Sequence, residues 1–257
     1  MAIHSTTHEA HHWEHSWAPA AIALAGLSFT LAFTSFFVYK APLLAIICAG
    51  LLVVFALAGI AKWMSEMGQP TVPALNSLGL SLFIFGEILI FLALFAGYWT
   101  LRIWVGIDNG VWPPAGTPDA LREKLNVLPL IMTAILVTSS LTYHQAEKAF
   151  EHETGGFTLW LLISIVLGVL FLGCTAYEYT HLWGAGFKLG TNQYSTPFYT
   201  LTGFHATHVL VGAAGFLAVL FGTMFGSVHK TLVKLVGVYW HFVDVVWFFV
   251  FSQLYFW

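Results

Sequence analysis

Six ionisable side chains lie inside long apolar runs of this sequence, where a charge is costly. An unpaired aspartate at the centre of a bilayer costs about 2.5–3.5 kcal/mol on insertion scales, so such residues should face protein and have partners. Carboxylates near imidazoles can hold a metal ion, relay protons or form a buried hydrogen-bond network. The six candidates for this intramembrane polar network are Glu87, Glu178, His205, His208, His241 and Asp244.

Spacing predicts which of these side chains could meet. His241 and Asp244 are three residues apart, so on a helix they share one face. Along alternating helices, at about 1.5 Å per residue, Glu87 and Asp244 lie about 18 and 20 Å from the same membrane side, and His208 reaches a similar depth. We therefore expect that Glu87, His208 and Asp244 could meet inside the membrane.

A hydrogen-bond network is favoured over a metal site for these residues. Helices that bind a metal between them often carry one Glu-x-x-His pair each, and no two facing spans do so here. His205 and His208 are three residues apart but have no carboxylate beside them in the sequence. The sequence thus predicts neither a metal ligand nor a catalytic residue, although a metal site and a proton relay remain open alternatives.

Composition places the chain in the membrane. Of its 257 residues, 58% are hydrophobic and 8% are charged, whereas soluble domains have roughly a quarter charged residues. The net charge of −3 and the few basic residues argue against nucleic-acid binding. Cys48 and Cys174 lie in apolar runs without ligand spacing, so we expect them to be packing residues.

Seven apolar segments are long enough to cross a bilayer, which predicts an all-α membrane protein with seven transmembrane helices. The short turn between the first two predicts a two-helix hairpin, and the polar stretch after them separates it from a five-helix bundle. The predicted organisation is a polar tail at 1–16, the hairpin at 17–62, a linker at 63–74 and the bundle at 75–257. The predicted spans are 17–38, 42–61, 75–102, 127–146, 157–179, 197–225 and 235–257.

The polar tail is rich in histidine and lacks lysine and arginine, so it is not a signal peptide. Its histidines could buffer protons or bind metal, and a solvated tail is the simpler interpretation. Lysine and arginine divide four against five between the two sides of the membrane, which gives no orientation. The tail histidines are His4, His8, His11, His12 and His15.

Five motifs follow one another along the chain: Glu87 in its apolar run, Trp112-Pro113-Pro114, Tyr177-Glu178-Tyr179, the stretch 202–209 and the stretch 239–247. In this order they are similar to those of one known family, subunit III of the haem-copper oxidases, best known as cytochrome c oxidase subunit III. Two departures from the family pattern are Ala206, where glycine is usual, and Gly86, where serine is common. Seven spans resemble the cytochrome c branch more than the five-helix branch of the quinol oxidases.

The resemblance implies a non-catalytic subunit of a proton-translocating oxidoreductase complex in aerobic respiratory electron transport. It implies no redox centre in this chain, with haem and copper held by partner subunits I and II and cytochrome c as the electron donor to the complex. The implied role is to support subunit I, in direct contact with it, including its proton uptake and the stability of its active site.

The resemblance also implies a shape and a location. Helices one and two form one arm of a V and the other five helices the second arm, with structural phospholipid in the cleft. We expect Trp63 near the lipid headgroups. The chain would lie in a bacterial plasma membrane or the mitochondrial inner membrane, with a cytoplasmic N-terminus. That places the tail histidines beside the proton entrance of subunit I, as a possible proton antenna.

Two other functions stay open at this point. The chain could be subunit III of a quinol oxidase, with the same supporting role and a different electron donor. It could also be a proton-coupled transporter, since intramembrane acids and histidines often mark ion paths. The sequence shows no inverted repeat or pair of broken helices, which disfavours a transporter.

Overall fold

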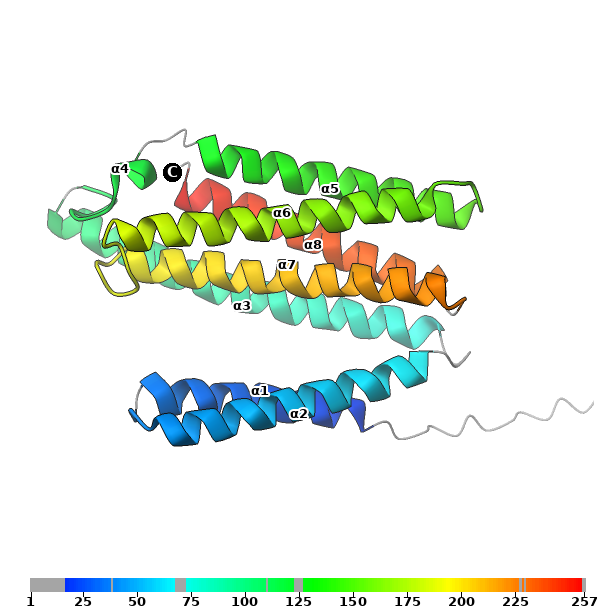
Figure 1. The fold of residues 1–257 in the computed structure, drawn as a ribbon. Coiled ribbons are helices and arrows are strands. Elements are labelled where there is room, and N and C mark those ends of the chain that lie inside the picture. The colour runs from blue at the N-terminus through cyan, green and yellow to red at the C-terminus, as the bar shows by residue number, and fades with distance from the viewer. Residues whose placement is uncertain are drawn as a thin grey trace, which may run out of the picture. The chain divides into compact units, whose positions relative to one another are not determined.

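The computed structural model describes residues 17–37, 39–67, 73–109, 111–122, 127–226, 228 and 230–255. The tail histidines lie outside this part of the chain. The residues divide into two compact units, 1–71 and 72–257, each of which is described by itself. Helices make up the regular structure of the described residues in both units (Figure 1).

The first unit is a helical hairpin of α1 (Ala18–Phe37) and α2 (Pro42–Met67). Its interface is built from small side chains, among them Ala21, Ala25 and Ala45, which are all buried. A Cβ at Gly59 would lie 2.8 Å from Ile22 Cδ1, so this glycine allows the two helices to approach closely. Small residues at such positions are typical of membrane helices, which gain from close contact.

The second unit contains five long helices and one short one. Within it, consecutive long helices run in opposite directions (Figure 1). The end of α3, the short helix α4, the α6–α7 link and the end of α8 lie at one end of this unit, and the α5–α6 and α7–α8 links lie at the other. The helices are α3 (Pro73–Asn109), α4 (Asp119–Arg122), α5 (Val127–Glu151), α6 (Phe157–Gly184), α7 (Ser195–Met224) and α8 (Lys230–Leu254).

Four of these helices form a ring, and the fifth packs against it. Helix α5 contacts α6, α6 contacts α7, α7 contacts α8, and α8 contacts α5. Helix α3 contacts only α7 and α8 among the helices described. Helix α8 therefore touches three neighbours and joins the ring to α3.

The side chain of Trp240 fills the centre of the ring and is fully buried. It extends from α8 across the ring, where a Cβ at Gly168 of α6 would lie 3.1 Å from its Cη2 atom. On α7, a Cβ at Gly212 would lie 2.5 Å from Trp240 Cε3, and Phe216 packs against the indole at 4.5 Å between ring centroids. Two glycines thus make the space that this tryptophan occupies.

The all-helical membrane fold expected from the sequence is confirmed, but the expected number of seven membrane-spanning helices is not. Six helices are long and apolar enough to cross a membrane, counting only the described residues. In α1, the apolar stretch among the described residues is Ala18–Phe29, which is shorter than these six. The number of seven spans therefore stays a prediction. Helix α4 was not expected, and α3 and α2 extend further than their predicted spans.

A substitution at Gly212 tests the packing around Trp240. We expect Gly212→Ala to lower the free energy of unfolding by about 1–3 kcal/mol, because overpacking forces a buried side chain or its backbone to move. Thermal or denaturant unfolding of the detergent-solubilised protein measures it. Gly173→Ala, in α6, is the matched control, since a Cβ there meets nothing within 4 Å. Equal stability of the two variants would contradict the packing described here.

Candidate functional site

Glu87 of α3 and His208 of α7 form a pair inside the second unit. Glu87 Oε2 lies 3.0 Å from His208 Nε2, and the two side chains are 16% and 9% exposed. Two aromatic rings pack against the imidazole of His208, with the ring centroids of Phe91 at 5.1 Å and of Phe204 at 4.7 Å from its centroid. The predicted meeting of Glu87 and His208 is thus seen in the structure.

The second nitrogen of His208 shows how this pair holds its proton. Nδ1 lies 2.8 Å from the carbonyl oxygen of Phe204, which can only accept, so Nδ1 carries a hydrogen and donates it. Nε2 then either accepts a hydrogen from a protonated Glu87 or donates one to the Glu87 carboxylate. In both forms Glu87 and His208 share one proton and are neutral together, which avoids the cost of a net charge in the membrane.

A second pair joins Glu178 of α6 to Tyr255, just after α8. The Tyr255 hydroxyl donates to Glu178 Oε2 at 2.8 Å. Burial raises the pKa of the Tyr255 phenol well above its ordinary value, so the group keeps its hydrogen and acts as the donor. Glu178 is also buried, at 5% exposed. This bond fixes the end of α8 against α6.

His241 and Asp244 of α8 do not join the Glu87 pair. His241 Nδ1 lies 2.6 Å from the Ser140 hydroxyl of α5. Both carboxylate oxygens of Asp244 are buried without a hydrogen-bond partner among the described residues, and Ser140 of α5 is near enough to interact with this side chain. The expectation that Asp244 meets Glu87 and His208 was therefore wrong. The depth of Asp244 suits that contact, but its face of α8 is turned toward α5.

His205 is separate from the other candidates. It is fully buried, and neither ring nitrogen has a hydrogen-bond partner within the described part of the chain. Its ring packs against both Phe171 and Trp247, at centroid distances of 5.7 and 5.2 Å. Of the six candidates, Glu87 and His208 pair with each other. Glu178 and His241 each pair with a residue that was not a candidate. The described residues thus form separate pairs rather than one continuous network.

The Trp112-Pro113-Pro114 motif belongs to an aromatic cluster at one end of the unit. The Trp112 ring packs edge-on against Tyr98 and Tyr194, at 5.8 and 5.6 Å between centroids. The Tyr98 hydroxyl donates to the carbonyl of Gln253, and the Tyr194 hydroxyl donates to the carbonyl of Leu254. These two tyrosines therefore donate to carbonyls in the last turn of α8, the part of a helix where carbonyls commonly need partners from outside it.

Sequence reasoning missed residues that act across helices. Ser140, His144, Glu147 and Tyr255 lie near predicted site residues, and none has a distinctive motif around it. The signal that could have found them is helical phase, because Ser140, His144 and Glu147 follow one another at spacings of four and three. The side chain of Trp63 lies outside the described part of the structure, like the tail histidines.

Comparison with known proteins decides the family. A family model described as cytochrome c oxidase subunit III matches residues 8–257. The chain belongs to this family. The resemblance inferred from its motifs is thereby confirmed, and the positions of Glu87, His208, Glu178 and Asp244 can be discussed as parts of a subunit III.

Relatives from distant organisms agree. A cytochrome c oxidase subunit 3 from Corynebacterium diphtheriae is 39% identical over 189 residues, which cover 72% of this chain and 89% of the relative. One from Thermostichus vulcanus is 37% identical over 71% of this chain and 88% of its own length. One from Aedes aegypti is 35% identical over 74% and 73%. The family therefore extends from bacteria to an animal.

The separation of the polar pairs can be measured with double-mutant cycles. We expect Glu87→Ala and His208→Ala to couple by about 0.6 kcal/mol, and by no more than about 1.7 kcal/mol, the range seen for hydrogen bonds between membrane helices. Glu178→Ala and Tyr255→Phe should couple by a similar amount. Equilibrium unfolding in mixed micelles gives each free energy.

The cross cycle is the control. Glu87→Ala combined with Tyr255→Phe should be additive within about 0.3–0.5 kcal/mol, as expected for sites without shared partners. A cross coupling as large as the coupling within each pair would show one connected network and contradict the arrangement described.

Proposed function

We propose that this chain is the non-catalytic subunit III of a cytochrome c oxidase, a haem-copper complex that reduces oxygen in aerobic respiration and translocates protons. The observation that carries this proposal is the family match over residues 8–257. The names of the relatives support cytochrome c rather than a quinol as the donor to the complex, since each is called a cytochrome c oxidase subunit. Nothing observed favours the transporter alternative.

The arrangement of polar groups supports a supporting role rather than a catalytic one. Glu87 with His208 joins α3 to α7, Glu178 with Tyr255 joins α6 to the end of α8, and Ser140 with His241 joins α5 to α8. Each pair fixes one helix against another. A rigid five-helix unit of this kind can hold the protein surface of subunit I and shape the path by which protons reach it.

The apolar surface supports a location in the membrane among lipids and partner subunits. Large side chains of α3 such as Leu82, Phe85 and Leu89 are exposed, at 63%, 57% and 50%. We propose that this chain contacts subunit I directly and that its N-terminus is cytoplasmic. We place subunit II, haem and copper elsewhere in the complex. The V-shaped cleft, its phospholipid and the headgroup position of Trp63 also stay proposals, and Trp63→Ala with phospholipid analysis would test them.

Removal of the subunit tests the proposed role. We expect an oxidase purified without this chain to keep its haem and copper and to reduce oxygen, because those centres belong to its partners. We also expect turnover to fall earlier during catalysis and proton uptake to slow at high pH. Oxygen consumption with reduced cytochrome c, followed over time at several pH values, measures both. Loss of haem or copper along with this chain would contradict a non-catalytic role.

The histidine tail gives a separate prediction about proton uptake. His4, His8, His11, His12 and His15 titrate near pH 6.5 as free side chains and could collect protons at the cytoplasmic face. Replacement of all five by glutamine should lower turnover chiefly above neutral pH, where bulk protons are scarce, without changing haem content. Equal turnover from pH ~6 to ~9, on either side of the histidine range, would show that the tail takes no part in uptake.

A further inference from the structure

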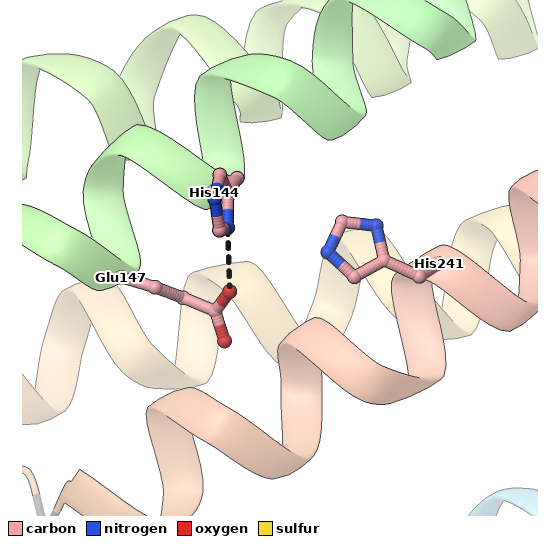
Figure 2. A group of neighbouring side chains, drawn as sticks. All are labelled: His144, Glu147 and His241. Atoms are coloured by element: carbon pink, nitrogen blue, oxygen red, sulfur yellow. Dashed lines mark ion pairs between the residues drawn. The ribbon is translucent and has the colours of Figure 1, made fainter.

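A cluster of two histidines and one carboxylate lies where α5 meets α8. His144 and Glu147 come from α5 and His241 from α8, and Figure 2 shows the three side chains turned toward a common space. One possible ligand atom from each residue lies within 4.8 Å of the others. His144 Nδ1 is 3.8 Å from Glu147 Oε2, which is too long for a hydrogen bond and leaves both groups able to take another partner.

The third residue of the cluster is already oriented by its neighbour. Ser140 occupies Nδ1 of His241 at 2.6 Å, so Nε2 is the nitrogen left to face His144 and Glu147. Histidines that bind metals commonly have their other ring nitrogen held in this way by a second group, which fixes the ring orientation. Ser140 lies one helical turn before His144, so α5 supplies both the ligands and the group that positions the ligand from α8.

The carboxylate is placed by a glycine on the facing helix. A Cβ at Gly237 would collide with the Glu147 carboxylate and approach Tyr143 Cε1 at 3.0 Å. Gly237 is one helical turn before His241, so the absence of a side chain there lets Glu147 reach the surface of α8. The close approach of the carboxylate to this glycine is a second observation, independent of the distances within the cluster, that points to a functional use of Glu147.

We propose that His144, Glu147 and His241 bind a divalent transition-metal ion of the Zn²⁺ class and that this ion links α5 to α8. Two imidazole nitrogens and one carboxylate oxygen suit Zn²⁺, whereas Ca²⁺ and Mg²⁺ prefer oxygen ligands and softer ions prefer sulfur. Three protein ligands leave a fourth position open for a small ligand such as water. The sequence search missed this set because it looked for Glu-x-x-His on both facing helices, and here a single His-x-x-Glu faces one histidine.

Binding requires a small closure of the cluster. Bonds of about 2.0–2.1 Å in a tetrahedral site place neighbouring ligand atoms about 3.3 Å apart, so the widest separation must shrink by roughly 1.5 Å. The His144 side chain is 49% exposed and can rotate to close this distance, while His241 is held by Ser140. Lys234 lies within electrostatic reach of Glu147 and competes with the ion for it.

An ion can reach the cluster from the nearer end of the helices. His144 lies seven residues before the last residue of α5, a distance of about 10 Å along the axis. Beyond it, Glu151 and Glu153 are exposed and add negative charge at that end. Exposed carboxylates of this kind raise the local concentration of cations.

Metal analysis of the purified membrane complex that contains this chain tests the proposal. After incubation with Zn²⁺ and removal of free metal, we expect the unaltered complex to hold one more equivalent of zinc than complexes with His144→Ala, Glu147→Gln or His241→Ala. Zn²⁺ should also raise the temperature at which this chain unfolds, and the shift should vanish in the same variants. X-ray absorption at the zinc edge should show nitrogen and oxygen ligands without sulfur.

Two exposed histidines outside the cluster provide matched controls. His152→Ala and His181→Ala should keep both the zinc and the thermal shift. Ser140→Ala should weaken zinc binding by about 10–100-fold, the usual effect of removing a group that orients a ligand. Chain content of the complex and the isosteric Glu147→Gln variant guard against misfolding. If the three ligand variants bind as much zinc as the unaltered complex, the proposal is overturned.

Discussion

The five-helix unit depends on close contact between helices, because its surroundings supply little hydrophobic driving force. Lipid tails are as apolar as leucine, so membrane helices associate through packing and hydrogen bonds. Large apolar residues accordingly cover the outside of α3, and a close contact lies at Trp240, where Gly168 and Gly212 make room for the indole. The tryptophan reaches across the ring to α6, where it packs at Gly168. One side chain therefore sets the spacing of three helices.

The polar side chains also hold helices together, through hydrogen bonds rather than through packing. A buried polar group without a partner is expensive in a membrane, so each hydrogen bond between helices also excludes arrangements that would break it. The Glu87 and His208 pair is neutral as a unit, and the Glu178 and Tyr255 pair relies on a phenol that keeps its hydrogen. Asp244 and His205 are exceptions within the described residues, since both are buried without hydrogen bonds. The indole nitrogens of Trp112 and Trp240 are also buried without partners among these residues.

The sequence predicted the elements well and the contacts between them poorly. Apolar runs define membrane helices because the bilayer fixes their length, and depth along antiparallel helices was enough to bring Glu87 to His208. Depth says nothing about which face of a helix a residue occupies, and so it misplaced Asp244. The partners Ser140 and Tyr255, and the cluster around Glu147, arise from rotation of neighbouring helices about their axes. Helix α4 is too short to produce a recognisable period.

The bonds at the end of α8 set an order of events during synthesis. Tyr98 on α3 and Tyr194 before α7 donate to the carbonyls of Gln253 and Leu254, and Glu178 receives the hydroxyl of Tyr255. These three side chains thus bond to residues at the end of α8, which is synthesised after every other helix described here. Helix α8 also closes the ring between α5 and α7 and, with α7, contacts α3. We expect a nascent chain that stops short of these residues to leave their polar partners unpaired in the membrane and to be degraded more readily for that reason.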